Sequence, residues 1–342
     1  MVGKMRERIL NAARRKPIDT TPIWIMRQAG RYLPEYRKLR EKHSMEEICQ
    51  TPELTVEATL QPLRRFDLDA AILFSDLLVP LWGMGVSFDL VEGRGPVLQK
   101  ALTPAELATL PPLDLGGVEF TFEAIRLLRR ELDRPLIGFT GGPFTFASYL
   151  IEGKPSRDYP RTRAFLHAYP REWEGLMKRL ADNLALYLRG QIEAGVQMVQ
   201  IFDSWVGVLS PEDFRERVKP YLNAQLEQVG NAVPRIYFST ASSHLFPEFA
   251  TLPVEVMGVD WRVSLTQATR IFGDAHALQG NLDPILLLGR EEDLHAKTLE
   301  IVTEGRALPG HIFSLGHGIL PTTPPERVEH LVDLVHEAGA RR

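Results

Sequence analysis

Eight short apolar runs, separated by segments with helical spacing, are the feature that most constrains how this chain folds. In order they are PIWIM at 22, AAILFSD at 70, LIGFTG at 136, VQMVQIFD at 196, RIYFST at 235, VEVMGVD at 254, HALQGNLD at 276 and HIFSLGHG at 311. Segments such as VEFTFEAIRLLRREL, REWEGLMKRLADNLALYLRGQIEAG and PERVEHLVDLVHEAGA place apolar residues on one helical face. Apolar strands that alternate with helices indicate a parallel sheet. Eight such units without a glycine fingerprint at the first turn favour a closed (β/α)8 TIM barrel over an open sheet.

The whole chain, residues 1–342, is predicted to form a single barrel domain. Its 342 residues are 44% hydrophobic and 25% charged, which is enough apolar material for one large core. The sequence contains no repeat of fixed length and no low-complexity linker that would separate a second domain. A stretch rich in glycine and proline near residues 82–112 is interpreted as a long insertion in the barrel.

Charge and cysteine content limit which partners the protein can bind and indicate the cellular compartment in which it works. The chain has 40 Lys and Arg against 44 Asp and Glu, and neither sign forms a long run, so nucleic acid and anionic membrane surfaces are not expected partners. Cys49 is the single cysteine, which excludes an internal disulfide and favours a reducing, cytoplasmic setting. The first ten residues are charged where a signal peptide is apolar, and no run approaches the length of a membrane span.

An arginine-rich segment, IWIMRQAGRYLPEYRKLR at residues 23–40, follows the first apolar run. Gly30 and Pro34 argue against one continuous helix across it, so its arginines are expected to begin in a loop. Several guanidinium groups at that place indicate either an anionic ligand or a structural ion-pair cluster, and the segment alone does not decide between them. The arginines are Arg27, Arg31, Arg37 and Arg40.

Polar residues close almost all of the apolar runs, where a barrel carries its active site. From the residues alone, Asp76 is a helix cap, an ion-pair partner or a catalytic carboxylate, and His317 and Tyr149 are more often structural. Ser204 lacks the surroundings of a nucleophilic serine, and no spacing of His and Cys suits zinc. The residues that close the runs are Arg27, Gln28, Ser75, Asp76, Thr140, Gly141, Gly142, Asp203, Ser204, Ser239, Thr240, Asp260, Asn281, Asp283, Gly316, His317 and Gly318.

Five motifs in order, MRQAGRYLPEYRKLR, FSDLLVP, GGPFTFASYLIEG, FDSWVG and LGHGILP, closely resemble the uroporphyrinogen decarboxylase family. The resemblance covers nearly the whole chain. It implies a (β/α)8 barrel that forms a homodimer with facing clefts and uses neither metal nor organic cofactor. Enzymes of this family convert the four acetate side chains of uroporphyrinogen III to methyl groups, which gives coproporphyrinogen III and carbon dioxide in haem biosynthesis.

The same resemblance implies a role for each matching residue. Asp76 is expected at the centre of the site, where it accepts hydrogen bonds from the pyrrole N–H groups. The chemistry of the step adds the hypothesis that Asp76 also supports the protonated pyrrole and that Arg27 assists proton delivery. Arg37 is expected to be structural. The substrate-binding residues are expected to be Arg27, Gln28, Ala29, Gly30, Arg31, Arg40, Asp76, Tyr149, Ser204 and His317.

Two other functions are compatible with such a barrel. A related group of barrels transfers methyl groups between a corrinoid protein and a thiol through zinc held by histidine and cysteine, a site that Cys49 alone does not supply. A carrier that binds a tetrapyrrole without releasing carbon dioxide is the second, and the presence of Asp76 disfavours it.

Overall fold

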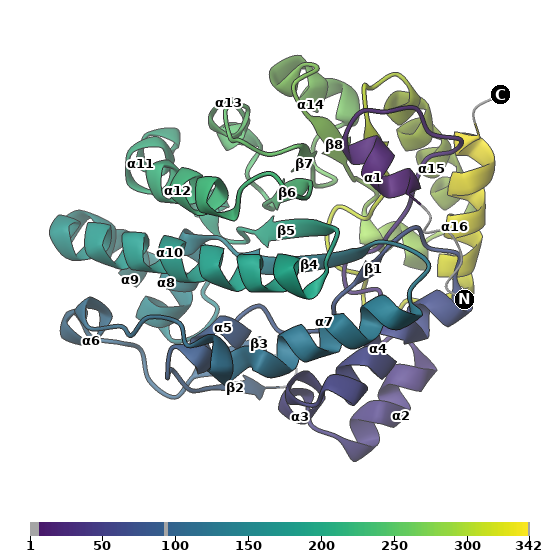
Figure 1. Ribbon diagram of the computed structural model, residues 1–342. Coiled ribbons are helices and arrows are strands. Elements are labelled where there is room, and N and C mark those ends of the chain that lie inside the picture. The colour runs from purple at the N-terminus through teal and green to yellow at the C-terminus, as the bar shows by residue number, and fades with distance from the viewer. Residues whose placement is uncertain (1–6, 92–94, 341–342) are drawn as a thin grey trace.

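Seven parallel strands form the barrel sheet in the computed structural model, which describes residues 7–91 and 95–340 (Figure 1). The strands follow one another around the sheet in the order of the chain, and every neighbouring pair is parallel. This order requires a crossover after each strand, as a (β/α)8 barrel does. The strands are β1 (Ala71–Ile72), β4 (Leu136–Gly141), β5 (Met198–Phe202), β6 (Arg235–Phe238), β7 (Val256–Gly258), β8 (Ala277–Gln279) and β9 (His311–Ile312).

The first apolar run, residues 22–26, occupies the eighth strand position and closes the barrel. Ile23 forms a parallel bridge with Phe313, just after β9. Trp24 N donates to Phe313 O at 3.3 Å, and Phe313 N donates to Pro22 O at 2.8 Å. The prediction of eight strand positions is therefore confirmed, although this first strand segment pairs through a single bridge.

Gln28 completes the other edge of the first strand segment, next to β1. Asp69 N donates to Ile23 O at 2.8 Å, and beyond this bond the Gln28 side chain takes the place of a backbone partner. Its Oε1 accepts from Ile25 N at 3.1 Å, while its Nε2 donates to Ala70 O at 3.1 Å. Buried backbone groups need such partners, so the Gln28 amide seals the barrel wall where no ladder forms.

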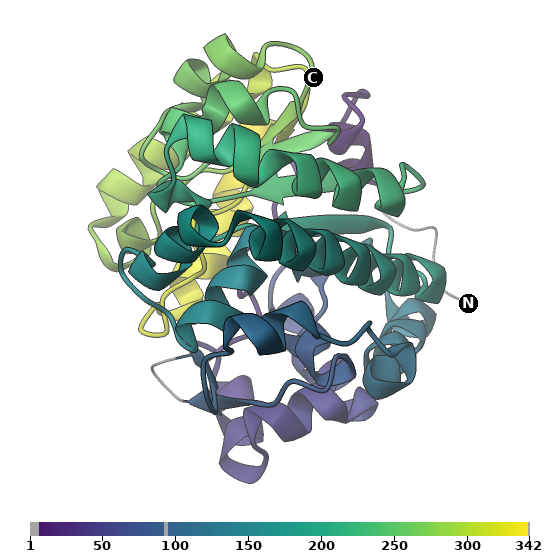
Figure 2. The ribbon, with the colours of Figure 1, turned by 90° about the vertical axis from the view of Figure 1, so that its left-hand side faces the viewer.

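A layer of helices surrounds the sheet, as the turned view in Figure 2 shows. Pro at the first turn begins several of them, since the missing N–H has no partner to lose there. No helix in the described ranges has the length and apolar character needed to cross a membrane. The outer helices are α4 (Pro52–Arg65), α7 (Glu119–Glu131), α10 (Pro170–Ala194), α12 (Lys219–Val229), α13 (Phe246–Phe249), α14 (Leu265–Phe272), α15 (Glu291–Arg306) and α16 (Pro325–Gly339), and they include the three that the sequence pattern predicts.

Shorter elements lie in the connections between strands and outer helices. The region interpreted as an insertion contains an antiparallel hairpin outside the barrel sheet, β2 (Phe88–Val91) with β3 (Gly95–Leu98). The shorter helices are α1 (Arg8–Ala13), α2 (Pro34–Lys42), α3 (Met45–Gln50), α5 (Val79–Gly83), α6 (Pro104–Ala108), α8 (Pro143–Glu152), α9 (Pro160–Ala168), α11 (Pro211–Arg217), and the 3₁₀ turns η1 (Leu115–Val118), η2 (Val206–Val208), η3 (Ser243–Leu245) and η4 (Pro284–Leu288).

The barrel interior is a packed core rather than a pore. An apolar cluster that includes Trp24, Ile137, Met198 and Ile312 is buried together with residues of α1, which contacts β8 and β9. A second, larger cluster fills the space between the sheet and the helices. Side chains that fill the interior leave ligands only the ends of the strands, so the site must be sought among the loops.

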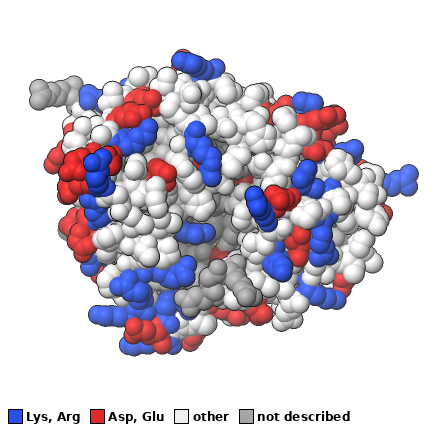
Figure 3. Space-filling model, turned by 180° about the vertical axis from the view of Figure 1, so that it is seen from behind, with Lys and Arg blue, Asp and Glu red and all other residues white. Residues whose placement is uncertain are grey.

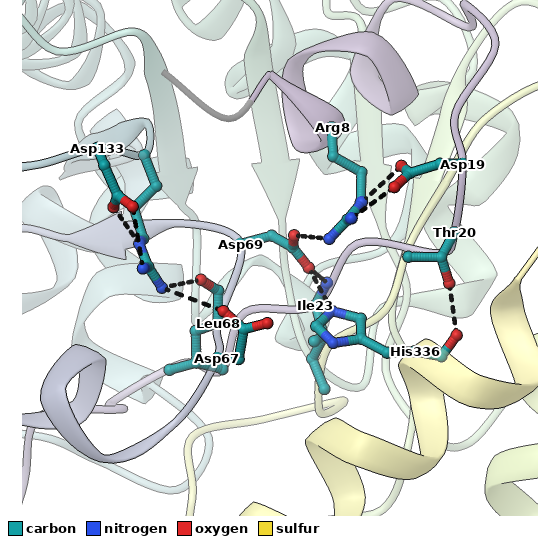
Figure 4. A network of polar contacts seen from close by, with 10 residues as sticks. Arg8, Asp19, Thr20, Ile23, Asp67, Leu68, Asp69, Asp133 and His336 are labelled. Atoms are coloured by element: carbon teal, nitrogen blue, oxygen red, sulfur yellow. Dashed lines mark hydrogen bonds and ion pairs between the residues drawn. The ribbon is translucent and has the colours of Figure 1, made fainter. Parts of the chain in front are cut away.

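A buried ion-pair network fastens the opposite, N-terminal end of the barrel (Figure 4). Asp69, 1% exposed, accepts from Ile23 N at 2.8 Å and pairs with Arg8 Nη1 at 2.6 Å. His336 Nε2 on α16 lies 2.8 Å from the same carboxylate. One aspartate thus joins α1, the first strand segment and the last helix, which is the stabilising role expected at the bottom face of a barrel.

Candidate active site

Arg27 begins the loop after the first strand segment in an uncommon backbone conformation. Its φ of +63° lies in the left-handed region, which a side chain other than glycine seldom adopts without compensation from its surroundings. The side chain runs along the loop that follows β9, because a Cβ on Gly318 would stand 2.6 Å from Arg27 Cδ. The second glycine of LGHGILP therefore makes room for the Arg27 side chain.

Asp76 stands at the C-terminal end of β1, where the chain turns into α5. Its Oδ1 accepts from Leu78 N at 2.9 Å, so the capping role that the sequence left open is real. Within the described part of the chain, Asp76 Oδ2 has no hydrogen-bond partner. Burial raises the pKa of Asp76 to about 6, although the Leu78 N–H and the positive charge of Arg27 both act to lower it.

Arg27, Asp76 and His317 follow three different strands, Tyr149 lies on α8, and the four side chains converge in one place. Burial raises the pKa of Tyr149, with the negative charge of Asp76 acting in the same direction and Arg27 against it. Burial likewise lowers the pKa of His317, and the charge of Arg27 lowers it further. The charge of Arg27 acts on all three other groups, and its side chain lies against Gly318, next to His317. The C-terminal end of the barrel thus joins one carboxylate, one guanidinium and two hydrogen-bonding side chains.

The helix that carries Tyr149, α8, is fixed by an internal carboxylate. Thr145 Oγ1 in its first turn donates to Asp203 Oδ1 at 2.7 Å, and Tyr237 OH donates to Asp203 Oδ2 at 3.1 Å. A Cβ on Gly142 would lie 2.3 Å from Asp203 Cγ, so glycine is required beside this carboxylate. The glycine-rich turn before α8 therefore receives the protein's own aspartate, which explains the motif without a bound phosphate.

An aromatic group lies behind Tyr149 on the loop after β5. The rings of Tyr149 and Trp205 meet edge to face with centroids 6.2 Å apart, and Trp205 lies 5.1 Å from Tyr159. Ser204 precedes Trp205 and is partly exposed. These contacts hold the Tyr149 ring in place.

Basic side chains border a hollow near the middle of the face shown in Figure 3. The chain as a whole carries a formal net charge of -4, so this distribution is local. Clustered positive charge with low-dielectric walls raises the local concentration of anions. Within the described residues, no group of three or more His, Cys, Asp or Glu side chains is arranged to hold a metal ion.

Comparison with known proteins decides the family. The family model described as uroporphyrinogen decarboxylase matches residues 4–338. Proteins named uroporphyrinogen decarboxylase from Salinispora tropica and Thermobifida fusca are 48% and 49% identical, over 97% of this chain and 90% and 92% of their own lengths. The chain belongs to the uroporphyrinogen decarboxylase family.

The fold also matches a more distant solved structure. A methyltransferase from Methanosarcina mazei superposes with a TM-score of 0.82 at 22% sequence identity, over 98% of each chain. At this identity the match shows the shared fold alone. Uroporphyrinogen decarboxylase family membership therefore rests on the sequence matches, and the methyltransferase supports the barrel architecture.

Gln28, Ala29 and Arg37, all in the arginine-rich segment, occupy positions that support the fold. Gln28 is fully buried and its amide is bonded to the backbone on both sides, so its geometry does not support the predicted side-chain contact with substrate. Ala29 is also buried. Arg37 Nη1 donates to the carbonyl oxygens of Arg31 and Tyr32 at 2.9 and 3.1 Å, a structural position as expected.

Gly30, Arg31 and Arg40 remain candidates near the same loop. A Cβ on Gly30 would approach Arg27 O at 3.0 Å, so glycine permits the tight turn. Arg31 is exposed. Arg40, on α2, donates from Nη1 to His43 O at 2.7 Å, and its charge lies close enough to Cys49 to oppose the rise in pKa that burial causes there. The charge of Asp76 also acts on Cys49, so Arg40 and Asp76 both lie near this cysteine.

Sequence reasoning missed Trp205 and the segment after β7. Trp205 stands inside the quoted FDSWVG motif, so the motif itself carried the signal. Asp260 was recognised as the residue that closes the sixth apolar run, but Trp261 and Arg262 directly after it were not considered. Extending each strand end by two residues would have included both.

Proposed function

We propose that this protein decarboxylates the four acetate side chains of uroporphyrinogen III and releases coproporphyrinogen III and carbon dioxide. Family membership supports this activity. The observation that carries it is the proximity of Asp76, a carboxylate with a raised pKa and one uncommitted oxygen, to the positive charge of Arg27. An acceptor beside a cation suits a substrate that has N–H groups at its centre and carboxylates at its edge.

The chemistry requires an electron sink, because loss of carbon dioxide from an acetate leaves an electron pair on the methylene carbon. Protonation of the pyrrole at a ring carbon supplies that sink. The carbon–carbon bond then breaks, and its electron pair enters the ring. A second proton converts the methylene group to methyl, and loss of the first proton from the ring carbon restores the neutral pyrrole, so one proton is taken up for each carbon dioxide released. In the proposal, Asp76 accepts the pyrrole N–H bonds and stabilises the cationic ring, while Arg27 assists proton delivery.

The peripheral carboxylates of the substrate need partners around this centre. We assign Arg31, Arg40, Tyr149, Ser204 and His317 to them, with Gly30 shaping the loop. Hydrogen bonds between charged groups contribute roughly 1.5–3 kcal/mol each, so a few such contacts provide most of the affinity for a ligand with eight carboxylates.

A cytoplasmic homodimer with facing clefts completes the proposal. Both properties follow from the family resemblance, and the single cysteine fits a reducing compartment. Light scattering coupled to size-exclusion chromatography measures the mass in solution. A mass equal to one 38.6 kDa chain would exclude the dimer.

Anaerobic incubation of the purified, metal-free protein with uroporphyrinogen III tests the activity. The products are oxidised and separated by chromatography according to their number of carboxylates. A ladder from eight to four carboxylates is the expected result. Substrate that is bound but unchanged would refute decarboxylation and indicate a carrier, and absence of binding would refute both.

A further inference from the structure

Arg262 lies just beyond β7 and is held by a buried aspartate. Asp260, 5% exposed, accepts from Arg262 Nη1 at 2.7 Å and from Arg262 N at 3.0 Å. The same carboxylate accepts from Ala241 N at 2.6 Å, on the loop after β6. Asp260 is therefore bonded to two neighbouring strand ends, and it fixes the direction in which the Arg262 side chain leaves the backbone.

Trp261 fixes the guanidinium from a second side and connects it with the active site. Arg262 Cζ lies 4.0 Å from the centroid of the Trp261 ring, within the range of a cation–π contact. The same indole meets the ring of His317 edge to face at 6.4 Å. A Cβ on Gly316 would stand 2.5 Å from Trp261 N, so the two loops are in close contact.

The charge of Arg262 reaches the candidate site. Burial and the charge of Arg27 are the main causes of the lowered pKa of His317. The charge of Arg262 lowers this pKa further, and the charge of Asp260 acts against it. The Arg262 side chain nevertheless keeps 46% of its surface exposed. Its bond to Asp260 uses Nη1, and among the described residues Nε and Nη2 have no hydrogen-bond partner.

The guanidinium of Arg262 is therefore positioned to bind a second anion. Two carboxylate oxygens fit the parallel N–H groups of the Nε and Nη2 edge, and an arginine already fixed by stacking and one ion pair loses little side-chain freedom on binding. A purely structural ion pair would have no need of an exposed edge at the C-terminal end of the barrel.

We propose that Arg262, positioned by Asp260 and Trp261, is a further substrate-binding residue that takes one peripheral carboxylate of the tetrapyrrole beside His317. This inference rests on the proposed function and deepens it. It adds a cation from the β7 side of the barrel to those that the loop after the first strand segment provides, so the macrocycle is held from two sides.

Steady-state kinetics with Arg262→Ala test the inference, with Arg262→Lys to keep the charge without the planar fork. The matched control is Arg64→Ala, which removes an exposed arginine that pairs with Glu57 at 2.9 Å on α4. Arg262→Ala should raise the Michaelis constant for uroporphyrinogen about tenfold with kcat changed less than about threefold, as expected for a lost charge-assisted pair. Arg262→Lys should lie between Arg262→Ala and wild type, and the control should match wild type.

The salt dependence separates a ligand contact from a structural role. The logarithm of the Michaelis constant should rise less steeply with ionic strength in Arg262→Ala than in wild type, because one attractive charge is missing. An unchanged Michaelis constant and salt dependence, or a fall in kcat alone, would overturn the inference while leaving the decarboxylase intact. A wild-type protein that forms no product would instead refute the proposed function on which the inference rests.

Discussion

Replacing Asp76 by asparagine tests the centre of the proposed mechanism. The amide keeps an oxygen that can accept from Leu78 N, so the turn into α5 is preserved while the negative charge is removed. A cationic ring about 4 Å from a carboxylate, at an effective dielectric constant of about 20, is stabilised by roughly 4 kcal/mol. The cost of burying this carboxylate is already present in the free protein, as its raised pKa shows. Asp76→Asn should therefore lower kcat about a thousandfold.

The pH profile gives the same test a second, independent measurement. With a pKa of about 6, Asp76 is mostly protonated at pH 5 and mostly ionised at pH 7. If the ionised form is required, kcat/KM of the wild type should rise about tenfold between these two values, relative to the variant. Dividing wild-type rates by Asp76→Asn rates at each pH removes the titration of the substrate's own carboxylates, which both proteins share.

The assay is anaerobic product formation from pH 5 to 8, with thermal unfolding of both proteins as the control for folding. Turnover of Asp76→Asn within about tenfold of wild type would contradict the electrostatic role, since the expected loss is far larger. A ratio of rates that does not change with pH would show that ionised Asp76 is not the acting form.

Arg31→Ala should raise the Michaelis constant about tenfold at low salt and less at high salt, because salt screens clustered charges; initial rates at two salt concentrations measure this, and an unchanged constant would exclude a substrate contact. Gly142→Ala should lower the free energy of unfolding in urea by about 1–3 kcal/mol through contact with Asp203, and a urea midpoint equal to that of wild type would disprove the clash. Burial raises the pKa of Asp203 to about 6, so the folded chain holds this proton more tightly than the unfolded chain. The contribution of Asp203 to the free energy of unfolding should therefore grow as the pH falls from about 6 to about 4. This contribution should be absent from Asp203→Asn, and identical pH dependence of urea unfolding in the two proteins would contradict it.

The alternation of apolar runs and helical segments in the sequence was sufficient to predict the barrel architecture. Each apolar run lies at a strand position because buried parallel strands need continuous apolar residues. The details depended on contacts that no local pattern encodes. Gln28 replaces a backbone partner across the barrel wall, which a one-dimensional pattern cannot show. Pro34 correctly argued against one continuous helix across residues 23–40, and it begins α2, because a helix tolerates proline in its first turn.

The sequence predicted individual residues of the candidate site but not how they come together. Strand ends indicated Arg27, Asp76 and His317, since barrels carry their chemistry there. Their convergence, in contrast, requires glycine at position 318, because a side chain there would clash with Arg27. This is a tertiary contact between residues near the two ends of the chain. The position of Arg262 is equally non-local, because Asp260 and Trp261 direct it toward His317 only after β7 and β9 have taken their places.

The pairing of Ile23 with Phe313 has a consequence for how the protein is made. A ribosome releases the first strand segment early, but its partner emerges only when nearly all of the chain has been synthesised. Until then both edges of the growing sheet present unpaired backbone groups, which are open to association with other chains. Contacts between such distant residues also slow folding, because a very large loop must close first. Successful production of this enzyme in a foreign host should therefore depend on the rate of translation and on chaperones that shield the open edges.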